Sequence, residues 1–302
     1  MWEPGHLRDG VVFTLVCAML ALVGVLVPFL FPVYGLLIVV VVALITSRHT
    51  AVHALAVTGA AAALTALFLG ALDAVMLLLE PALLGILYGL CFKNRVAHHK
   101  TLAAGVGVAL VLVGFDLVIL FRVLGESPYE WLAAGVVLDG QPEVMEQAVR
   151  VAATLLPGAL IAWALLVAWA AFFLAAAFLQ RFGILPGPAP VFHRWRLPWA
   201  VVWLAIAGLA ATLIGDHWGL GTLALIGKNA LFVAAVGFML AGLILAAYLW
   251  RELPHPRWLK ILVGVAAVIN WPVTLGMLVI AGFLDSWHDC RSCYERKRRD
   301  KA

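Results

Sequence analysis

The sequence predicts an all-α fold, a polytopic integral membrane bundle of about eight or nine transmembrane helices. Of the 302 residues, 65% are hydrophobic and only 12% are charged, whereas a soluble domain is about half apolar and about a quarter charged. The apolar runs are long and lack the two-residue alternation of outer-membrane barrels. Because only helices and closed barrels satisfy the backbone in lipid, helices are expected.

Nine apolar runs follow one another, and a span needs about 20 residues. They cover residues 11–31, 33–47, 51–69, 71–92, 102–122, 151–180, 197–215, 229–250 and 259–284. The first is expected to be retained, since no A-x-A-like cleavage site follows it. The second is short and follows Pro28 and Pro32, which predicts a thin helix in a tight hairpin.

Lys and Arg predict the direction of each span. Basic residues gather after the second, fourth, sixth and eighth runs, and the intervening loops are more acidic. This alternation predicts a cytoplasmic N-terminus. Nine spans would then leave the basic tail, residues 285–302, outside, against the rule. The stretch Gly215 to Asn229 is therefore expected to be a half-helix that enters and returns, or an extension of the eighth helix.

The connecting segments carry their own signals. "SPYE" from Ser127 to Glu130 is a capping-box pattern that predicts a short interfacial helix. Another helix is expected from Pro142 into the sixth span, kinked at Pro157. "PGPAP" lies in a Pro-rich linker, residues 186–195, and predicts a division between a membrane domain and C-terminal helices. The predicted domains are residues 1–185 and 196–284.

Ionisable residues inside spans usually face the bundle interior or a cavity and mark function. Asp73 and Glu80 are seven residues apart on the fourth run, so they share a helix face about 10 Å apart along the axis. Asp116 lies near the outer end of the fifth run. The three acids predict an outward-facing polar pocket between the fourth and fifth helices for a cationic or hydrogen-bond-donating ligand. The alternative is a structural Asp73–Arg122 pair, with the other acids protonated or bonded to neighbouring helices.

Other intramembrane polar and small residues predict helix packing. Gly85 and Gly89 follow Glu80 and Pro81 at a spacing of four, which permits close helix approach. This segment is either a kinked binding helix or a packing seam alone. Two asparagines inside apolar runs, Asn229 and Asn270, are expected to form structural hydrogen bonds to neighbouring helices.

Several function classes lack their motifs. The chain has no G-x-x-x-x-G-K-[ST], H-E-x-x-H or G-x-S-x-G motif. We therefore do not expect a P-loop ATPase, a zinc metalloprotease or a serine hydrolase, and we expect no cofactor. A single C-x-x-C, Cys290 and Cys293, offers two ligands where structural zinc needs four, so no metal site is expected. The net charge of +4 is assigned to basic loops, not to nucleic-acid binding.

Short C-terminal segments carry a resemblance to a known family. "RLPWAVVWL" (residues 196–204), "KNALFVAAVGFMLAGLILAAYLWRE" (228–252) and "AGFLDSWHDCR" (281–291) resemble the YybS-like family of predicted bacterial inner-membrane proteins, whose function is unassigned. That family is distantly similar to the substrate-binding S components of energy-coupling-factor transporters and to a rod-shape envelope protein. The resemblance implies a bacterial inner membrane and an S-component-like arrangement of the first six helices.

Two functions are expected from these observations. The first is a small-molecule-binding or transport-associated subunit, whose partner the resemblance identifies as a separate coupling subunit with ATPases. "CAMLA" (residues 17–21) stands where S components often carry an A-x-x-x-A seam, and three extra helices follow the first six. The alternative is a non-transporting scaffold in cell-envelope or membrane-complex assembly. Both contact the lipid bilayer, and the first also binds a small polar or cationic ligand.

Overall fold

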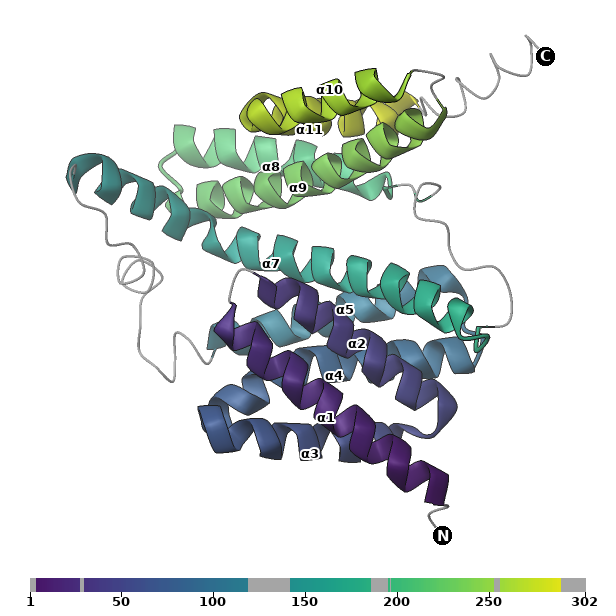
Figure 1. Ribbon diagram of the computed structural model, residues 1–302. Coiled ribbons are helices and arrows are strands. Elements are labelled where there is room, and N and C mark those ends of the chain that lie inside the picture. The colour runs from purple at the N-terminus through teal and green to yellow at the C-terminus, as the bar shows by residue number, and fades with distance from the viewer. Residues whose placement is uncertain are drawn as a thin grey trace. The chain divides into compact units, whose positions relative to one another are not determined.

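A computed structural model describes residues 4–27, 30–118, 142–185, 195, 197–252 and 256–288, and these ranges fold into helices joined by short turns, without a strand (Figure 1). The all-α prediction is confirmed. The helices are α1 (Pro4–Leu26), α2 (Phe31–Arg48), α3 (Ala51–Leu69), α4 (Ala71–Lys93), α5 (His98–Val118), α7 (Pro142–Arg181), α8 (Ala200–His217), α9 (Gly221–Glu252), α10 (Arg257–Ile269) and α11 (Trp271–His288).

Seven of the described helices are long and apolar enough to cross a membrane, and α10 with α11 raises the number to eight if the bent pair is one span. This agrees with the predicted polytopic bundle. Large apolar side chains are exposed along these helices, as lipid-facing positions require. The short second helix is also found: its apolar part is Pro32–Arg48. Its middle is buried, with Ile38, Val42 and Ile45 at most 1% exposed.

The chain divides into two compact units, which are described separately. The first comprises Met1–Val123 and Trp163–Pro190, and the second comprises Leu124–Ala162 and Val191–Ala302. This grouping assigns the first half of α7 to the second unit. The domain boundaries predicted from the Pro-rich linker stay a prediction. Residues 186–194 of the linker, the "SPYE" segment and Arg122 lie outside the described residues, whereas α7 does begin at Pro142.

In the first unit, α2 and α4 pack closely through two glycines. A Cβ on Gly85 would lie 2.7 Å from Val42 Cβ, and one on Gly89 would lie 2.6 Å from Thr46 Cβ. Residue numbers rise together in both helices, so α2 and α4 are parallel. The Ser47 hydroxyl, close to the end of α2, donates to the Gly89 carbonyl at 3.3 Å. The packing seam that the glycine spacing predicts therefore exists, and its partner is α2.

The second half of α7 runs in the same direction as α4. The Tyr88 hydroxyl donates to the Ala168 carbonyl at 2.7 Å, and four residues later the rings of Phe92 and Phe172 stack with centroids 5.6 Å apart. Both contacts join residues of α4 to residues 80 positions later in α7. The C-terminal ends of α2, α4 and α7 consequently meet at one end of the unit, which we call the C-terminal edge.

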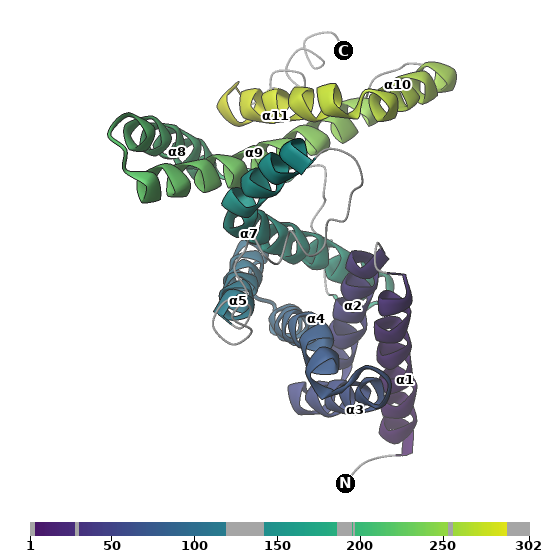
Figure 2. The ribbon, with the colours of Figure 1, turned by 90° about the vertical axis from the view of Figure 1, so that its left-hand side faces the viewer.

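The helices between them run the opposite way. A Cβ on Gly10 of α1 would lie 3.5 Å from His53 Nε2 of α3, and the Thr14 hydroxyl donates to the Val57 carbonyl at 3.5 Å. α1 and α3 are therefore parallel to each other and begin at the C-terminal edge. Figure 2 shows α1 beside α2 and α3, where Cys17, Ala21 and Val42 share one apolar core. α5 begins five residues after the end of α4 and packs against Tyr88 at Gly105, so it also starts at this edge. The six helices described in this unit thus alternate in direction, as the alternating basic loops predict.

The second unit contains an α8–α9 hairpin. α8 ends at His217 and α9 begins at Gly221, and Lys228 Nζ lies 3.1 Å from Asp216 Oδ1 across the hairpin. Residues 221–229 therefore form the first turns of α9 and extend the eighth predicted span, so the alternative of a separate half-helix is wrong. Val202 of α8 and Phe238 of α9 share a core. Figures 1 and 2 both show the two helices side by side.

The ninth apolar run is broken instead. α10 and α11 meet at a bend of 106° at Asn270, which fits a broken span or a re-entrant loop. The apolar run at residues 259–284 is thus two helices at an angle and not one continuous helix. Pro272, at the second position of α11, has no N–H to continue the α10 hydrogen-bond series. The run that complicates the membrane topology is thus the last one, where Asn-Trp-Pro interrupts the apolar sequence.

The α2–α4 seam predicts a steric effect of a single methyl group. Gly85→Ala should lower the free energy of unfolding by about 1–3 kcal/mol, because the new Cβ overpacks a filled contact. The new Cβ would lie 2.7 Å from Val42 Cβ and 2.8 Å from the Val39 carbonyl oxygen, so it has no room. The measurement is the thermal stability of the purified protein in detergent. It is monitored as the loss of the monodisperse peak in size-exclusion chromatography after heating.

Gly59→Ala is the matched control, since a Cβ on this exposed α3 glycine meets nothing within 4 Å. Its stability should be unchanged or slightly raised, because alanine favours helix. Equal stability of the Gly85→Ala variant and the wild type would contradict the close α2–α4 approach.

Candidate functional site

Glu80 lies in the middle of α4, immediately before Pro81. α4 continues through this proline as one helix from Ala71 to Lys93. Proline has no N–H, so the Leu77 carbonyl one turn earlier loses its usual intrahelical donor. Leu77 and Glu80 both line the same pocket in the first unit. The segment therefore places a carboxylate at a cavity within a span.

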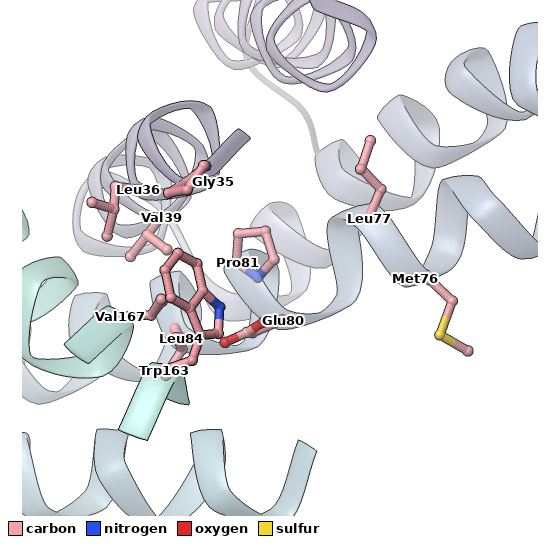
Figure 3. Close-up of a pocket in the computed structure, with 11 residues that line it drawn as sticks. Gly35, Leu36, Val39, Met76, Leu77, Glu80, Pro81, Leu84, Trp163 and Val167 are labelled. Carbon is pink, nitrogen blue, oxygen red and sulfur yellow. The ribbon is translucent and has the colours of Figure 1, made fainter. Parts of the chain in front are cut away.

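The pocket has a volume of about 200 Å³ and its walls come from α2, α4 and α7 (Figure 3). Among the lining residues that the structure describes, Glu80 is the only ionisable one. In Figure 3 its side chain points from α4 toward the side of the pocket formed by Trp163, whereas Met76 points away. The lining residues are Pro32, Gly35, Leu36, Val39, Met76, Leu77, Glu80, Pro81, Leu84, Trp163 and Val167.

The α2–α4–α7 register explains why these side chains meet. Gly85 faces Val42 and Val39, so one turn earlier Glu80 and Pro81 face the start of α2. Tyr88 bonds Ala168, so two turns earlier α4 faces the stretch that contains Trp163. Glu80 is half-buried, and Trp163 is 42% exposed. The wall of the cavity thus contains a partly shielded carboxylate and a large aromatic side chain.

The predicted acids do not all reach this pocket. Asp73 is exposed in the first turn of α4 and is not among the lining residues. A carboxylate at that position interacts favourably with the positive end of the helix dipole. Asp116 lies in α5, but its side chain and Arg122 lie outside the described part of the chain. The pocket between α4 and α5, and the Asp73–Arg122 pair, stay predictions.

Asn229 has a defined structural environment in the second unit. Its Oδ1 accepts from the Gly158 backbone N–H at 2.6 Å, and its Nδ2 donates to the Thr154 carbonyl at 2.9 Å. In a regular helix the Gly158 N–H would bond to that same Thr154 carbonyl. The amide of Asn229 is thus inserted between the two groups, beside Pro157, and satisfies both.

Asn270 occupies the break between α10 and α11. Its backbone N–H donates to the Ala266 carbonyl at 2.9 Å, and its carbonyl accepts from the Thr274 N–H at 3.0 Å. The Thr274 hydroxyl also donates to the Ala267 carbonyl at 2.9 Å. The side chain of Asn270 is exposed. These contacts fix the bend through backbone groups and through Thr274.

Trp163, Gly35 and Leu36 are pocket residues that the sequence does not single out. Trp163 lies inside the sixth apolar run, away from the run ends where belt tryptophans gather, and that position is the one available signal. In the described residues, no group of three His, Cys, Asp or Glu side chains is arranged to hold a metal ion. Cys17 and Cys91 are free thiols.

Comparison with known proteins gives a family. The model of the family described as "Predicted membrane protein (DUF2232)" matches residues 15–136 and 132–286, which together cover most of the chain. The chain belongs to the DUF2232 family. No curated protein and no solved structure matches it. The family description agrees with the apolar helices of the fold and names no activity, so the function of this DUF2232 protein is argued from its site.

The Asn229 bridge predicts a measurable loss of stability. Asn229→Ala should lower the free energy of unfolding by about 1 kcal/mol, the scale of interhelical hydrogen bonds in membranes. The loss arises because the Gly158 N–H and the Thr154 carbonyl lose their common partner. The measurement is the thermal midpoint of the purified protein in detergent.

Asn94→Ala serves as the control, because Asn94 is an exposed residue in the turn after α4. It should leave the midpoint within the range of ordinary surface substitutions. If the two variants lowered the midpoint equally, the bridge would not be the source of the effect.

Proposed function

We propose that this DUF2232 protein is a small-molecule-binding, transport-associated subunit of the bacterial inner membrane, with a cytoplasmic N-terminus and Glu80 in its binding site. The observation that carries the proposal is a half-buried carboxylate lining an otherwise apolar pocket inside a span. Such residues are rare in spans and usually mark a substrate or ion pathway. The class of ligand then depends on which chemical groups a carboxylate in this pocket can bind.

A charged side chain at the centre of a span costs roughly 2.5–3.5 kcal/mol on insertion scales. A ligand that offers a positive charge or hydrogen-bond donors to the carboxylate offsets this cost when it binds. Trp163 lines the same pocket, and an aromatic ring can add attraction for a cation. We therefore assign a small cationic or donor-rich ligand, and we assign Asp116 and Asp73 supporting roles as further acids on α5 and α4.

The proposal includes no catalytic step and no ATP hydrolysis by this chain, because the sequence has no P-loop or metal-enzyme motif. Transport would depend on a separate energy-supplying partner. The resemblance to YybS-like proteins, and through them to S components, supports this arrangement. The six alternating helices of the first unit are consistent with it, while the helices of the second unit are additional to an S component.

Glu80→Gln tests the pocket directly. The amide keeps the shape of the side chain and removes its charge, so it should abolish ligand-dependent thermal stabilisation while leaving membrane insertion intact. The measurement is a thermal-shift screen of purified protein against a polar small-molecule extract of the source cells, followed by pure amines and quaternary ammonium compounds. Asp216→Asn is the matched control, since Asp216 is an exposed acid of the second unit and does not line the pocket.

The control variant should keep at least part of every ligand response. If Glu80→Gln and Asp116→Asn both keep every ligand response, the acids do not form a binding site and the proposal fails. That result would favour the alternative function, a non-transporting scaffold in envelope or membrane-complex assembly.

Partner identity separates the two functions independently of any ligand. Affinity purification from native membranes, with mass spectrometry of co-purified proteins, should recover a coupling subunit and ATPases if the protein serves transport. Stoichiometric recovery of envelope-assembly proteins, without ATPases, would contradict transport and support the scaffold.

A further inference from the structure

The C-terminal edge of the first unit carries a concentration of positive charge. α2, α4 and α7 end there and α5 begins there, because these four helices pack in the register set by Gly85, Gly89 and Tyr88. Five basic side chains at these helix ends are exposed to the surroundings. They are Arg48, Lys93, Arg95, Lys100 and Arg181.

Two contacts hold these helix ends together. Lys93 Nζ of α4 donates to the His49 carbonyl after α2 at 2.5 Å. The Arg48 guanidinium lies over the ring of Phe182, 5.6 Å from its centroid, and Phe182 directly follows Arg181 at the end of α7. Arg48 is therefore next to the ends of both α4 and α7. The positive charge belongs to one surface and not to separate loops.

Acidic residues do not balance this surface. Within the described part of the first unit, Asp9 is the acid at this edge, and its carboxylate lies 3.8 Å from His49 Nε2. The titratable histidines here are His49 and His53, whose rings are 4.8 Å apart, and His98 and His99 at the start of α5. The opposite ends of the same helices, residues 18–38, 62–78, 108–118 and 163–170, contain no Lys or Arg.

Part of the charge has a structural role. A helix C-terminus carries about half a negative charge, which a nearby cation stabilises. Lys93 serves this role through its bond to the His49 carbonyl. Three helix C-termini amount to roughly one and a half negative charges, so the five cations exceed what the helix ends need. Arg48 and Arg181 present exposed guanidinium groups beyond that requirement.

We propose that this edge binds the phosphate of an anionic phospholipid headgroup, with Arg48 and Arg181 as the recognising side chains. α4 has 23 residues and is about 34 Å long, slightly more than the hydrocarbon thickness of about 30 Å. Its end therefore reaches headgroup depth. Guanidinium groups match phosphate oxygens with paired hydrogen bonds. Phe182, 50% exposed beside Arg48, offers an apolar surface to the lipid below the phosphate.

Native mass spectrometry of the detergent-purified full chain tests this site with phosphatidylglycerol and phosphatidylcholine as probes. Wild-type protein should retain phosphatidylglycerol preferentially, because each basic side chain near a charged lipid surface contributes about 5-fold in affinity. Arg48→Gln with Arg181→Gln should weaken that retention about 30-fold. Arg150→Gln with Lys260→Gln, two basic residues of the second unit, is the matched control and should keep it.

Two further measurements do not depend on the folding of the glutamine variant. Arg48→Lys with Arg181→Lys keeps the charge and should lose less affinity than the glutamine pair. In wild-type protein, phosphatidylglycerol retention should fall as sodium chloride rises from about 0.05 M to about 0.5 M, since the contact is electrostatic.

Three results would overturn the proposal: equal retention of the two lipids by wild-type protein, unchanged phosphatidylglycerol retention in the glutamine variant, or retention that is independent of salt. Full displacement of the lipid by millimolar inorganic phosphate would also overturn it, because the edge would then be a site for soluble anions. The proposal does not depend on a ligand at Glu80, so either one can fail alone.

Discussion

The close approach of α2 and α4 at Gly85 and Gly89 is the constraint on which the first unit depends. A Cβ added to either glycine would lie only 2.6–2.8 Å from backbone and side-chain atoms of α2, which is too close for a side chain to fit. In lipid there is no hydrophobic drive between helices, so this van der Waals contact and the hydrogen bonds beside it determine the packing. The contact fixes the parallel register of the two helices, and the Glu80 pocket and the ends of α2 and α4 at the C-terminal edge take their positions from that register.

Two prolines in spans are accommodated in different ways, and the difference separates a structural site from a functional one. At Pro157, the Asn229 amide takes the place of a helical hydrogen bond and satisfies a donor and an acceptor. At Pro81, the Leu77 carbonyl loses its helical donor and the neighbouring Glu80 lines a cavity. Polar groups in a span must be satisfied by protein, water or ligand. The first arrangement bonds a donor and an acceptor within the second unit, whereas the second places a carboxylate at a cavity.

Hydropathy and charge identified the helices because both signals are local. The runs, the alternation of direction and the helix start at Pro142 follow from the sequence, and so does the close packing expected of Gly85 and Gly89. The residues that these polar groups contact could not be predicted from the sequence, because they lie far along the chain. Asn229, for example, bonds to groups 71 and 75 residues away. The pocket wall from α7 was missed for the same reason, since Trp163 reaches Glu80 only through the Tyr88–Ala168 register. The sequence shows an interruption at Asn270, but not the sharp bend there, because apolar residues continue on both sides of it.

The pocket and the basic edge belong to one helix and are nevertheless separate in charge. Glu80 and Lys93 are thirteen residues apart on α4, which places them about 20 Å apart along the axis. That distance is far beyond the roughly 4 Å at which a carboxylate and an ammonium group form an ion pair. The cations at the edge therefore do not supply the counter-charge of Glu80. Whatever neutralises this carboxylate acts within its own part of the span, so recognition at the pocket is set by groups there and not by the basic surface at the end of the helix.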